Sequence, residues 1–422
     1  MGNQDDGKHM KHLHSLFLLT FLVLSVSVLG KKWEVGPGLP LHSIKKALTL
    51  SQPFDTLFIQ PGIYKEGNIA IHKPIIILGK SKPILDGEGK FEILSIFASK
   101  VHIEGLCIRN SGHSSVNDFA GIKIYNQKQV CILNNDLQNC FFGIYSQNSS
   151  QCQIENNHLL SASIQEQQSG NGIHCWKCSL MKITGNTIQG HRDGIYFEFV
   201  TNSFIWHNLS SQNLRYGLHF MFSNQDTYLG NHFLNNGSGV AVMFSNHVKM
   251  YYNVFEENWG DASYGLLLKE ISDGEILRNV FIKNTSGIFM EGASRLLIQD
   301  NRFQSNGWGM KIQASCMDLT VFHNGFYGNT FDVGTNGTLS LNRFYQNYWD
   351  KYKGYDLNKD GLGDSPFRPI SLFSVVIENN PPSLLLFRSM VAGLMDESEK
   401  LIPSLTPLDL FDDQPLIKPL KP

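Results

Sequence analysis

The chain repeats a pattern of hydrophobic and polar positions with a period close to 22 residues. After each repeated glycine, the first and third residues are mostly apolar and the second and fourth are mixed, as in the segments after Gly194 and Gly239. This alternation with a period of two predicts strands that bury one face. The glycines are Gly121, Gly143, Gly172, Gly194, Gly217, Gly239, Gly265, Gly287 and Gly309.

Two asparagine series and one phenylalanine series follow the same repeat. One asparagine stands fourteen residues after each of the first eight glycines, from Asn135 to Asn301, and fifteen after the ninth, at Asn324. A phenylalanine follows two residues later from Phe233 onward, and a second asparagine five residues later from Asn213 to Asn347. The pattern predicts a right-handed parallel β-helix, an all-β solenoid in which stacked asparagines link the turns and phenylalanines fill the bore. A leucine-rich repeat has a similar period but needs a Leu-x-x-Leu-x-Leu motif, which is absent.

The N-terminal part is expected to hold a signal peptide and the start of the solenoid. In residues 1–30, Lys8 and Lys11 precede an apolar run from Leu16 to Leu29, which is typical of a secretory signal and favours a protein exported from the cytoplasm. An uncleaved anchor is the alternative, although the run is short for a membrane span. Residues 31–120 are expected to form irregular coils beneath a short helix over Leu41–Ser51, and residues 121–347 the regular repeats.

The C-terminal part changes character after Asn347. Residues 348–370 form an Asp-rich segment, and residues 371–422 are predicted to contain one helix over Ser383–Ile402 and a Pro-rich apolar tail. This helix could cap the last coil, or its apolar stripe could dock onto a partner protein. The residues expected in the docking stripe are Leu384, Leu385, Phe387, Val391 and Leu394.

Charge and cysteine content narrow the range of partners and of covalent chemistry. The formal net charge is −2, so no global electrostatic field favours nucleic acid as a partner. The seven cysteines are an odd number spread through the repeats, which favours buried core residues over a disulfide framework. The single Cys175-x-x-Cys178 pair is too isolated to identify a redox or metal site.

Two methionines and a histidine form a candidate copper site. In the predicted coils Met221 and Met243 are vertical neighbours, and His219 lies on the same face of its strand as Met221. Thioether and imidazole ligands together suit Cu(I). The alternative is an apolar patch for a partner protein, to which Leu267 and Phe289 would also contribute.

A candidate calcium loop follows the last coil. Oxygen-bearing side chains occupy its positions 1, 3, 5 and 9, and a glycine occupies position 6, as at the start of a calcium-binding loop. Position 12 is Phe367 instead of glutamate, so the segment is not an EF-hand. The predicted ligands are Asp356, Asn358, Asp360 and Asp364; the alternative is a polar turn without a metal.

An acidic residue among basic ones, Asp193, raises the possibility of a polysaccharide lyase or epimerase. Glu198 and Arg215 of the adjoining coils are its possible partners, but no paired acidic constellation of the kind that glycosidases need is evident. A salt bridge within the turn, between Arg192 and Asp193, is the favoured interpretation.

Several segments together make the chain resemble the NosD family. They include His191–Tyr196, Arg215–Ser223, Val242–Ser245, Gly265–Leu268 and Asn347–Asp350, followed by the Asp-rich loop and the apolar C-terminal helix. The glycine and asparagine ladders are common to many β-helices, whereas the two Met-Phe-Ser segments and the C-terminal segment are more specific.

The resemblance implies a non-enzymatic periplasmic accessory protein. Family members assist the maturation of the copper–sulfur centre of nitrous oxide reductase together with an ABC-type ATPase, a membrane permease and a copper chaperone lipoprotein. The expected role is transient copper handling, with peripheral attachment to the permease through the C-terminal helix. The runner-up is a secreted β-helix that binds or modifies polysaccharides.

Overall fold

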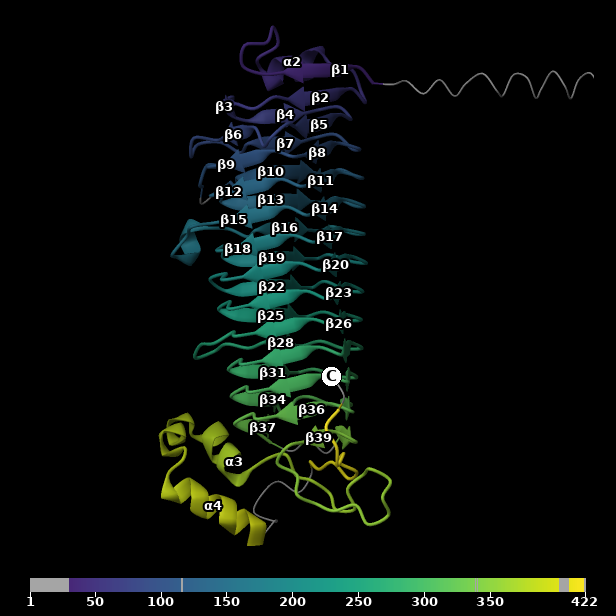
Figure 1. The fold of residues 1–422 in the computed structure, drawn as a ribbon, viewed down its shortest axis with the longest axis vertical. Helices are drawn as coiled ribbons and strands as arrows, with labels where there is room; N and C mark the ends of the chain where they lie inside the picture. Colours follow the sequence, from purple (N-terminus) through teal and green to yellow (C-terminus); the bar gives the residue numbers. More distant parts are fainter. Residues whose placement is uncertain (1–29, 115–116, 338, 340, 402–409, 421–422) are drawn as a thin grey trace, which may run out of the picture.

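The computed structural model describes residues 30–114, 117–337, 339, 341–401 and 410–420. The chain forms a right-handed parallel β-helix whose strands stack along the long axis of the molecule (Figure 1). Each regular coil contributes one strand to each of three parallel sheets, here named sheets A, B and C. The predicted fold is therefore confirmed, while the predicted signal peptide lies outside the described residues.

Sheet A contains 14 strands and follows sheet C within each coil. Its strands are β1 (Lys32–Val35), β2 (Thr56–Ile59), β5 (Ile76–Gly79), β8 (His102–Glu104), β11 (Cys131–Leu133), β14 (Gln153–Glu155), β17 (Lys182–Thr184), β20 (Phe204–Trp206), β23 (Thr227–Leu229), β26 (Lys249–Tyr251), β29 (Glu275–Leu277), β32 (Leu297–Gln299), β35 (Thr320–Phe322) and β38 (Arg343–Tyr345).

Sheet B contains 13 strands and comes directly after the first asparagine ladder. Its strands are β3 (Ile63–Tyr64), β6 (Ile84–Asp86), β9 (Cys107–Arg109), β12 (Asp136–Gln138), β15 (His158–Leu160), β18 (Thr187–Gln189), β21 (Leu209–Ser211), β24 (His232–Leu234), β27 (Val254–Glu256), β30 (Val280–Ile282), β33 (Arg302–Gln304), β36 (Gly325–Tyr327) and β39 (Tyr348–Trp349).

Sheet C contains 12 strands, the longest of which begin beside the repeated glycines. Its strands are β4 (Ile69–Ile71), β7 (Leu94–Ile96), β10 (Ala120–Tyr125), β13 (Phe142–Gln147), β16 (Ile173–Trp176), β19 (Asp193–Glu198), β22 (Tyr216–Met221), β25 (Ser238–Met243), β28 (Leu266–Lys269), β31 (Ser286–Glu291), β34 (Trp308–Ile312) and β37 (Phe331–Gly334).

The asparagine ladder links each coil to its neighbours through buried hydrogen bonds. The side-chain amide of Asn253 donates to the Asn279 side-chain oxygen and to the Tyr228 carbonyl, both at 3.0 Å. The Asn253 oxygen in turn accepts from the Asn231 backbone N–H at 3.0 Å. Because both polar atoms of the amide are satisfied by adjacent coils, this side chain is suited to a buried turn that repeats.

The interior is apolar, as the sequence predicts. Phe233, Phe255, Phe281 and Phe303 stack with ring centroids 4.6–5.4 Å apart. Six of the seven cysteines are buried, and all seven are free thiols.

The two ends of the solenoid are covered differently. At the N-terminal end, helix α2 (Ile44–Leu50) buries Ile44 and Leu48, within the predicted range. At the other end, Asp412 of the tail takes the next position in the asparagine ladder: its carboxylate accepts from the Asn347 backbone N–H at 2.9 Å and from the Trp349 indole at 3.0 Å. The C-terminal tail therefore caps the last coil.

The prediction of one continuous helix over Ser383–Ile402 is wrong. Helix α3 (Leu372–Asn379) ends before this segment, which is divided between the 3-10 helix η2 (Pro381–Leu386) and helix α4 (Met390–Leu401). Two consecutive prolines follow α3 and cannot continue its hydrogen-bonding pattern, and Arg388 has a positive φ of 63° between η2 and α4. A further 3-10 helix, η1 (Glu166–Gln168), lies in the insertion before Gly172.

Candidate functional site

Met221 and Met243 lie side by side on the outer face of sheet C. Strands β22 and β25 pair in parallel register with Met221 opposite Met243, and both side chains are half-buried. Neighbouring strands lie about 4.8 Å apart. The two thioethers predicted to be vertical neighbours are therefore neighbours in the structure.

His219 lies on the same strand as Met221, as predicted, but other side chains cover it. Its side chain is only 5% exposed, because the rings of Tyr196 and Tyr216 pack against the imidazole with centroids 4.9 and 4.8 Å away. Its Nδ1 lies 3.7 Å from the Asp193 carboxylate, and neither ring nitrogen has a hydrogen-bond partner in the described part of the chain. The imidazole thus faces the Asp193 carboxylate through Nδ1 without a hydrogen bond, on the same strand as Met221.

Tyr196 connects the histidine layer to the methionine pair. Its hydroxyl donates a hydrogen bond to the Met221 sulfur at 3.5 Å, and its ring packs on His219. Burial, reinforced by the nearby Glu198 carboxylate, raises the pKa of Tyr196 to about 12, so the phenol keeps its proton at neutral pH. A thioether is a weak acceptor, which means that this hydrogen bond orients Met221 without strongly occupying its sulfur.

Asp193 pairs with Arg215 of the next coil and not with Arg192, its neighbour in the sequence. Its fully buried carboxylate accepts hydrogen bonds from Arg215 Nε at 2.8 Å and Nη2 at 2.5 Å. Burial opposes ionisation, but the hydrogen bonds and charge of Arg215 outweigh it and lower the pKa of Asp193 to about 2. The predicted turn salt bridge with Arg192 is wrong, because Arg192 donates to Asn171 across the coil instead. A buried carboxylate paired in this way stabilises the fold and is poorly placed to act as a base on a polysaccharide.

Three exposed phenylalanines, which were not among the candidate residues predicted from the sequence, border the methionine pair. Phe199, Phe222 and Phe244 follow strands β19, β22 and β25, and their rings stack with centroids 5.2 and 5.1 Å apart. They are 43%, 39% and 42% exposed. Together with Met221 and Met243 they form what we call the Met–Phe strip.

The backbone at these three phenylalanines adopts a conformation that is unusual for such a bulky residue. All three have positive φ, between 49° and 54°, and the equivalent turns of other coils carry Asn126, Asn148 or other polar residues. A bulky residue in the left-handed region costs roughly 1–2 kcal/mol, and asparagine tolerates it better. Stacking between neighbouring rings offsets this cost without any net gain in stability, so a surface function explains the exposed rings better than stability does. The signal in the sequence is the fifth position after the glycine in three consecutive repeats.

The polar side chains of the Asp-rich loop form hydrogen bonds within the loop, mostly to its own backbone. Asp356 accepts hydrogen bonds from the backbone N–H groups of Asp360 and Gly361, at 3.2 and 3.0 Å. The Asn358 side chain donates to Asp360 at 3.0 Å, and Asp364 accepts from the Leu357 N–H at 2.5 Å. Within the described residues, no group of three or more His, Cys, Asp or Glu side chains is arranged to hold a metal ion. The calcium site remains a prediction.

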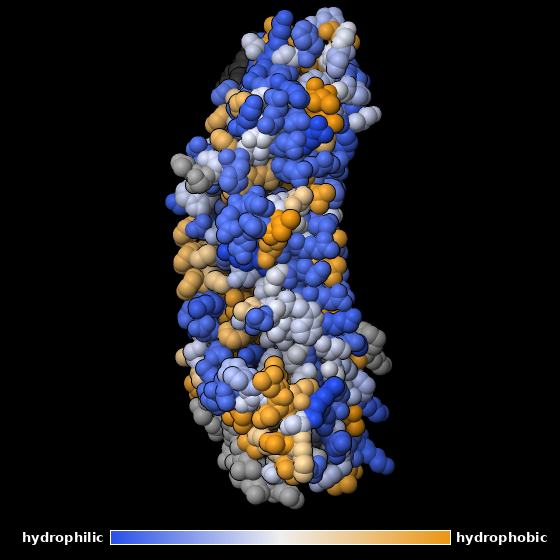
Figure 2. All heavy atoms as spheres, turned by 90° about the vertical axis from the view of Figure 1, so that its left-hand side faces the viewer, coloured by the Kyte–Doolittle hydropathy of each residue, from blue (hydrophilic) through white to orange (hydrophobic). Residues whose placement is uncertain are grey.

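The C-terminal helices both cover a strand and expose apolar side chains. Phe373 and Ile377 of α3 form a small buried cluster with Phe331 of β37. The other side of the segment is exposed: Figure 2 shows apolar side chains gathered at this end of the molecule. The predicted docking residues are 40–90% exposed, namely Leu384, Leu385, Phe387, Val391 and Leu394. In the part of the chain that the structure describes, no helix is long and apolar enough to cross a bilayer.

Fold and surface together define a parallel β-helix with a sulfur-bearing outer face and an apolar helical end. The family model described as periplasmic copper-binding protein (NosD) matches residues 160–359, which include the Met–Phe strip. Two relatives are each named "Probable ABC transporter binding protein NosD". The one from Stutzerimonas stutzeri is 25% identical over 84% of this chain and 85% of its own length. The one from Pseudomonas aeruginosa is 26% identical over 91% and 96%.

The chain is thus similar to the NosD family through its central coils and to both relatives along most of its length. Among solved structures it is similar to the surface adhesin PfbA of Streptococcus pneumoniae, with a TM-score of 0.56 and 14% identity over 68% of this chain and 87% of that one. At this identity the likeness concerns the fold alone.

Proposed function

We propose that this protein is a non-enzymatic periplasmic accessory protein that handles Cu(I) for the copper–sulfur centre of nitrous oxide reductase, together with an ABC-type ATPase and permease. The observation that carries the proposal is the paired thioethers of Met221 and Met243, set in an apolar surface strip within the matched family region. Thioether sulfur is a soft ligand that favours Cu(I) over the harder divalent ions.

In this proposal copper is cargo, and the surface around it serves transfer. The half-buried thioethers are accessible to an incoming protein, and His219 lies on the same strand as Met221 with neither ring nitrogen in a hydrogen bond within the described part of the chain. The three phenyl rings give a copper-carrying partner, such as a chaperone lipoprotein, an apolar surface that excludes water around the ion. Weak, exposed ligation of this kind suits a metal that has to leave again.

The C-terminal helical segment is the proposed dock for the permease. Its exposed apolar side chains include Leu385, at 90% exposure, and Val391, at 50%. Contiguous apolar surface on a protein outside the membrane commonly marks a protein interface. Replacing both residues by glutamate should abolish co-purification with the co-expressed ATPase–permease complex. Leu50→Glu, at the opposite end of the solenoid, is the matched control because Leu50 is similarly exposed, at 48%.

The Asp-rich loop is proposed to bind a structural calcium ion. Its three carboxylates and one amide supply the hard oxygen ligands that Ca²⁺ prefers. Binding would release the side chains from their present hydrogen bonds to the loop backbone. A calcium-dependent rise in melting temperature that Asp356→Asn plus Asp360→Asn removes would support the site, and identical melting in calcium and in chelator would argue against it.

A titration with Cu(I) against a competing chelator tests the copper proposal. The double variant Met221→Leu plus Met243→Leu keeps side-chain volume and removes both sulfurs, so we expect at least a tenfold loss of affinity. Met317→Leu is the control, because Met317 is an exposed methionine outside the strip, at 46%. Unchanged stoichiometry and affinity in the double variant would refute the assignment of these ligands.

A further inference from the structure

A groove of about 940 Å³ runs along the seam between sheets A and B, beginning at Tyr252 in the coil that carries Met243 on sheet C. One wall is a column of turn residues that precede the ladder asparagines, from Tyr252 to His323. The floor is the outer face of strands β30, β33 and β36. The other wall is the C-terminal tail from Leu416 to Leu420. We call this feature the seam groove.

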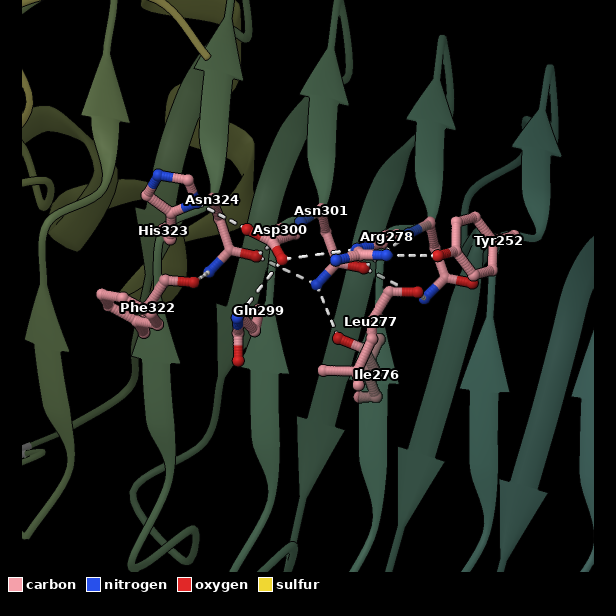
Figure 3. A network of polar contacts seen from close by, with 11 residues as sticks. Tyr252, Ile276, Leu277, Arg278, Gln299, Asp300, Asn301, Phe322, His323 and Asn324 are labelled. Carbon is pink, nitrogen blue, oxygen red and sulfur yellow. Dashed lines mark hydrogen bonds and ion pairs between the residues drawn. The ribbon is translucent and has the colours of Figure 1, made fainter. Parts of the chain in front are cut away.

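The turn wall is a connected polar network, drawn in Figure 3. The Arg278 guanidinium donates to the Tyr252 hydroxyl and lies 3.5 Å from the Asp300 carboxylate. His323 Nδ1 lies 2.5 Å from the other oxygen of Asp300. One carboxylate thus serves both Arg278 and His323, whose side chains remain 59% and 41% exposed.

The floor combines aliphatic side chains with a stacked guanidinium. Val280 and Ile282 project outward from β30 into the groove. On the next strands, the Arg302 guanidinium lies over the Tyr327 ring at 4.7 Å and its Nε donates to Gln304. The Tyr327 ring in turn folds over Gly325, where an added Cβ would come within 2.5 Å of the ring. The ring face nearest the floor is therefore already covered and does not offer a free platform for a sugar.

Charge is unevenly distributed in this lining. Arg278, Arg302 and Lys418 contribute three cations, whereas Asp300 is the single carboxylate among the lining residues and is already paired. The tail adds the apolar side chains of Leu416 and Leu420 opposite the aliphatic floor. Cations beside an apolar channel complement a molecule that has a negative head and an apolar body.

We propose that the seam groove binds an anionic amphiphile, a single alkyl chain that carries a carboxylate or phosphate group. The alkyl chain lies between the aliphatic floor and the tail, and the headgroup pairs with Arg302 and Arg278. The site shares no residue with the Met–Phe strip or the helical dock, so it stands whether or not the copper proposal holds.

Calorimetric titration of the full-length protein with dodecanoate and with dodecyl phosphate, both below their micelle concentrations, tests this site. We expect saturable binding of at least one of them with one molecule per protein, and the two arms distinguish the carboxylate from the phosphate headgroup. Dodecyl maltoside, which lacks charge, and inorganic phosphate, which lacks the chain, should each bind at least tenfold more weakly.

Two variants and two matched controls link binding to the groove. Arg302→Gln and Ile282→Glu should each weaken binding about tenfold or more, since the first removes a cation and the second adds a negative charge to the floor. Arg295→Gln removes a paired surface arginine elsewhere, and Leu234→Glu changes a half-buried residue at the equivalent position of another sheet B strand. Both controls should bind like the wild type.

Three results would overturn the proposal. They are no binding of either amphiphile, equal binding of dodecyl maltoside or inorganic phosphate, or binding that both groove variants leave intact. Binding of an extended peptide of alternating Leu and Glu, without binding of either amphiphile, would assign the groove to a protein segment instead. Circular dichroism melts of each variant verify that a loss of binding is not a loss of fold.

Discussion

The asparagine ladder and the phenylalanines of the Met–Phe strip are both vertical columns of turn residues, but they differ in what determines the residue type. In the ladder, Asn253 is buried and its amide is satisfied by the coils on both sides, so the fold itself requires asparagine. In the strip, Phe222 is exposed and adopts a positive φ that phenylalanine tolerates poorly. Repetition in the first column reflects folding, and departure from repetition in the second agrees with the surface function proposed for the strip.

The largest effect is expected at Asp226, on the inner side of the turn that carries Phe222. Burial raises the pKa of Asp226 to about 8, although the Ser203 backbone N–H donates to one carboxylate oxygen, because the other oxygen has no hydrogen-bond partner among the described residues. The folded-state pKa lies above the unfolded value near 4. Stability is therefore fully present below about pH 4 and is lost as the pH rises toward 8.

Asp226→Asn should remove this loss of stability. At pH 8 the variant should be more stable than the wild type by more than about 3 kcal/mol, since each unit of pKa shift corresponds to about 1.4 kcal/mol. At pH 4 the two should be equal. Denaturant unfolding at pH 4, 6 and 8 measures the difference, and parallel pH profiles for the two proteins would contradict it.

Breaking the ladder should have the next largest effect. Asn253→Ala leaves the Tyr228 carbonyl and the Asn231 N–H without their buried partner, which costs about 3 kcal/mol at roughly 1–3 kcal/mol per unsatisfied group. The control Asn117→Ala changes an exposed asparagine and should shift the free energy of unfolding by less than about 0.5 kcal/mol. Equal effects at both positions would refute the distinction between ladder and surface.

The buried Asp193–Arg215 pair should make stability sensitive to acid. The folded-state pKa of Asp193, about 2, lies below the unfolded value near 4. The stabilisation is therefore present above pH 4 and is lost as the pH falls through 2. The contribution is about 2 kcal/mol. Asp193→Asn should lack this drop when unfolding is followed between pH 5 and pH 2, whereas Asp273→Asn, in an exposed pair, should retain it.

The smallest effect on stability is expected in the strip itself. Phe222→Asn relieves the strained backbone but removes two ring contacts worth about 0.5–1.5 kcal/mol each, so the terms nearly cancel and the melting temperature should stay close to that of the wild type. Cu(I) transfer from a carrier protein should nevertheless slow. A strong destabilisation would show that the stack is structural, and the comparison with the ladder would then fail.

Most of the fold could be predicted from the sequence, because each coil repeats the same local requirements. The glycines, the alternating strands, Asn135 to Asn347 and the core phenylalanines all occupy positions that the solenoid needs in every turn. The register of Met221 and Met243 followed from that repeat. The C-terminal segment does not repeat, so periodicity could not reveal where α3, η2 and α4 begin and end.

Within the candidate site, the sequence by itself determined which residues share a column, since the coil length fixes vertical neighbours. Only the tertiary structure decided what each side chain meets there: that Tyr196 and Tyr216 cover His219, that Arg215 and not Arg192 neutralises Asp193, and that Asp412 completes the asparagine ladder. Such contacts depend on side-chain direction and on segments far apart in the chain. A repeat of about 22 residues encodes the positions of neighbours but does not encode which of them turn toward each other.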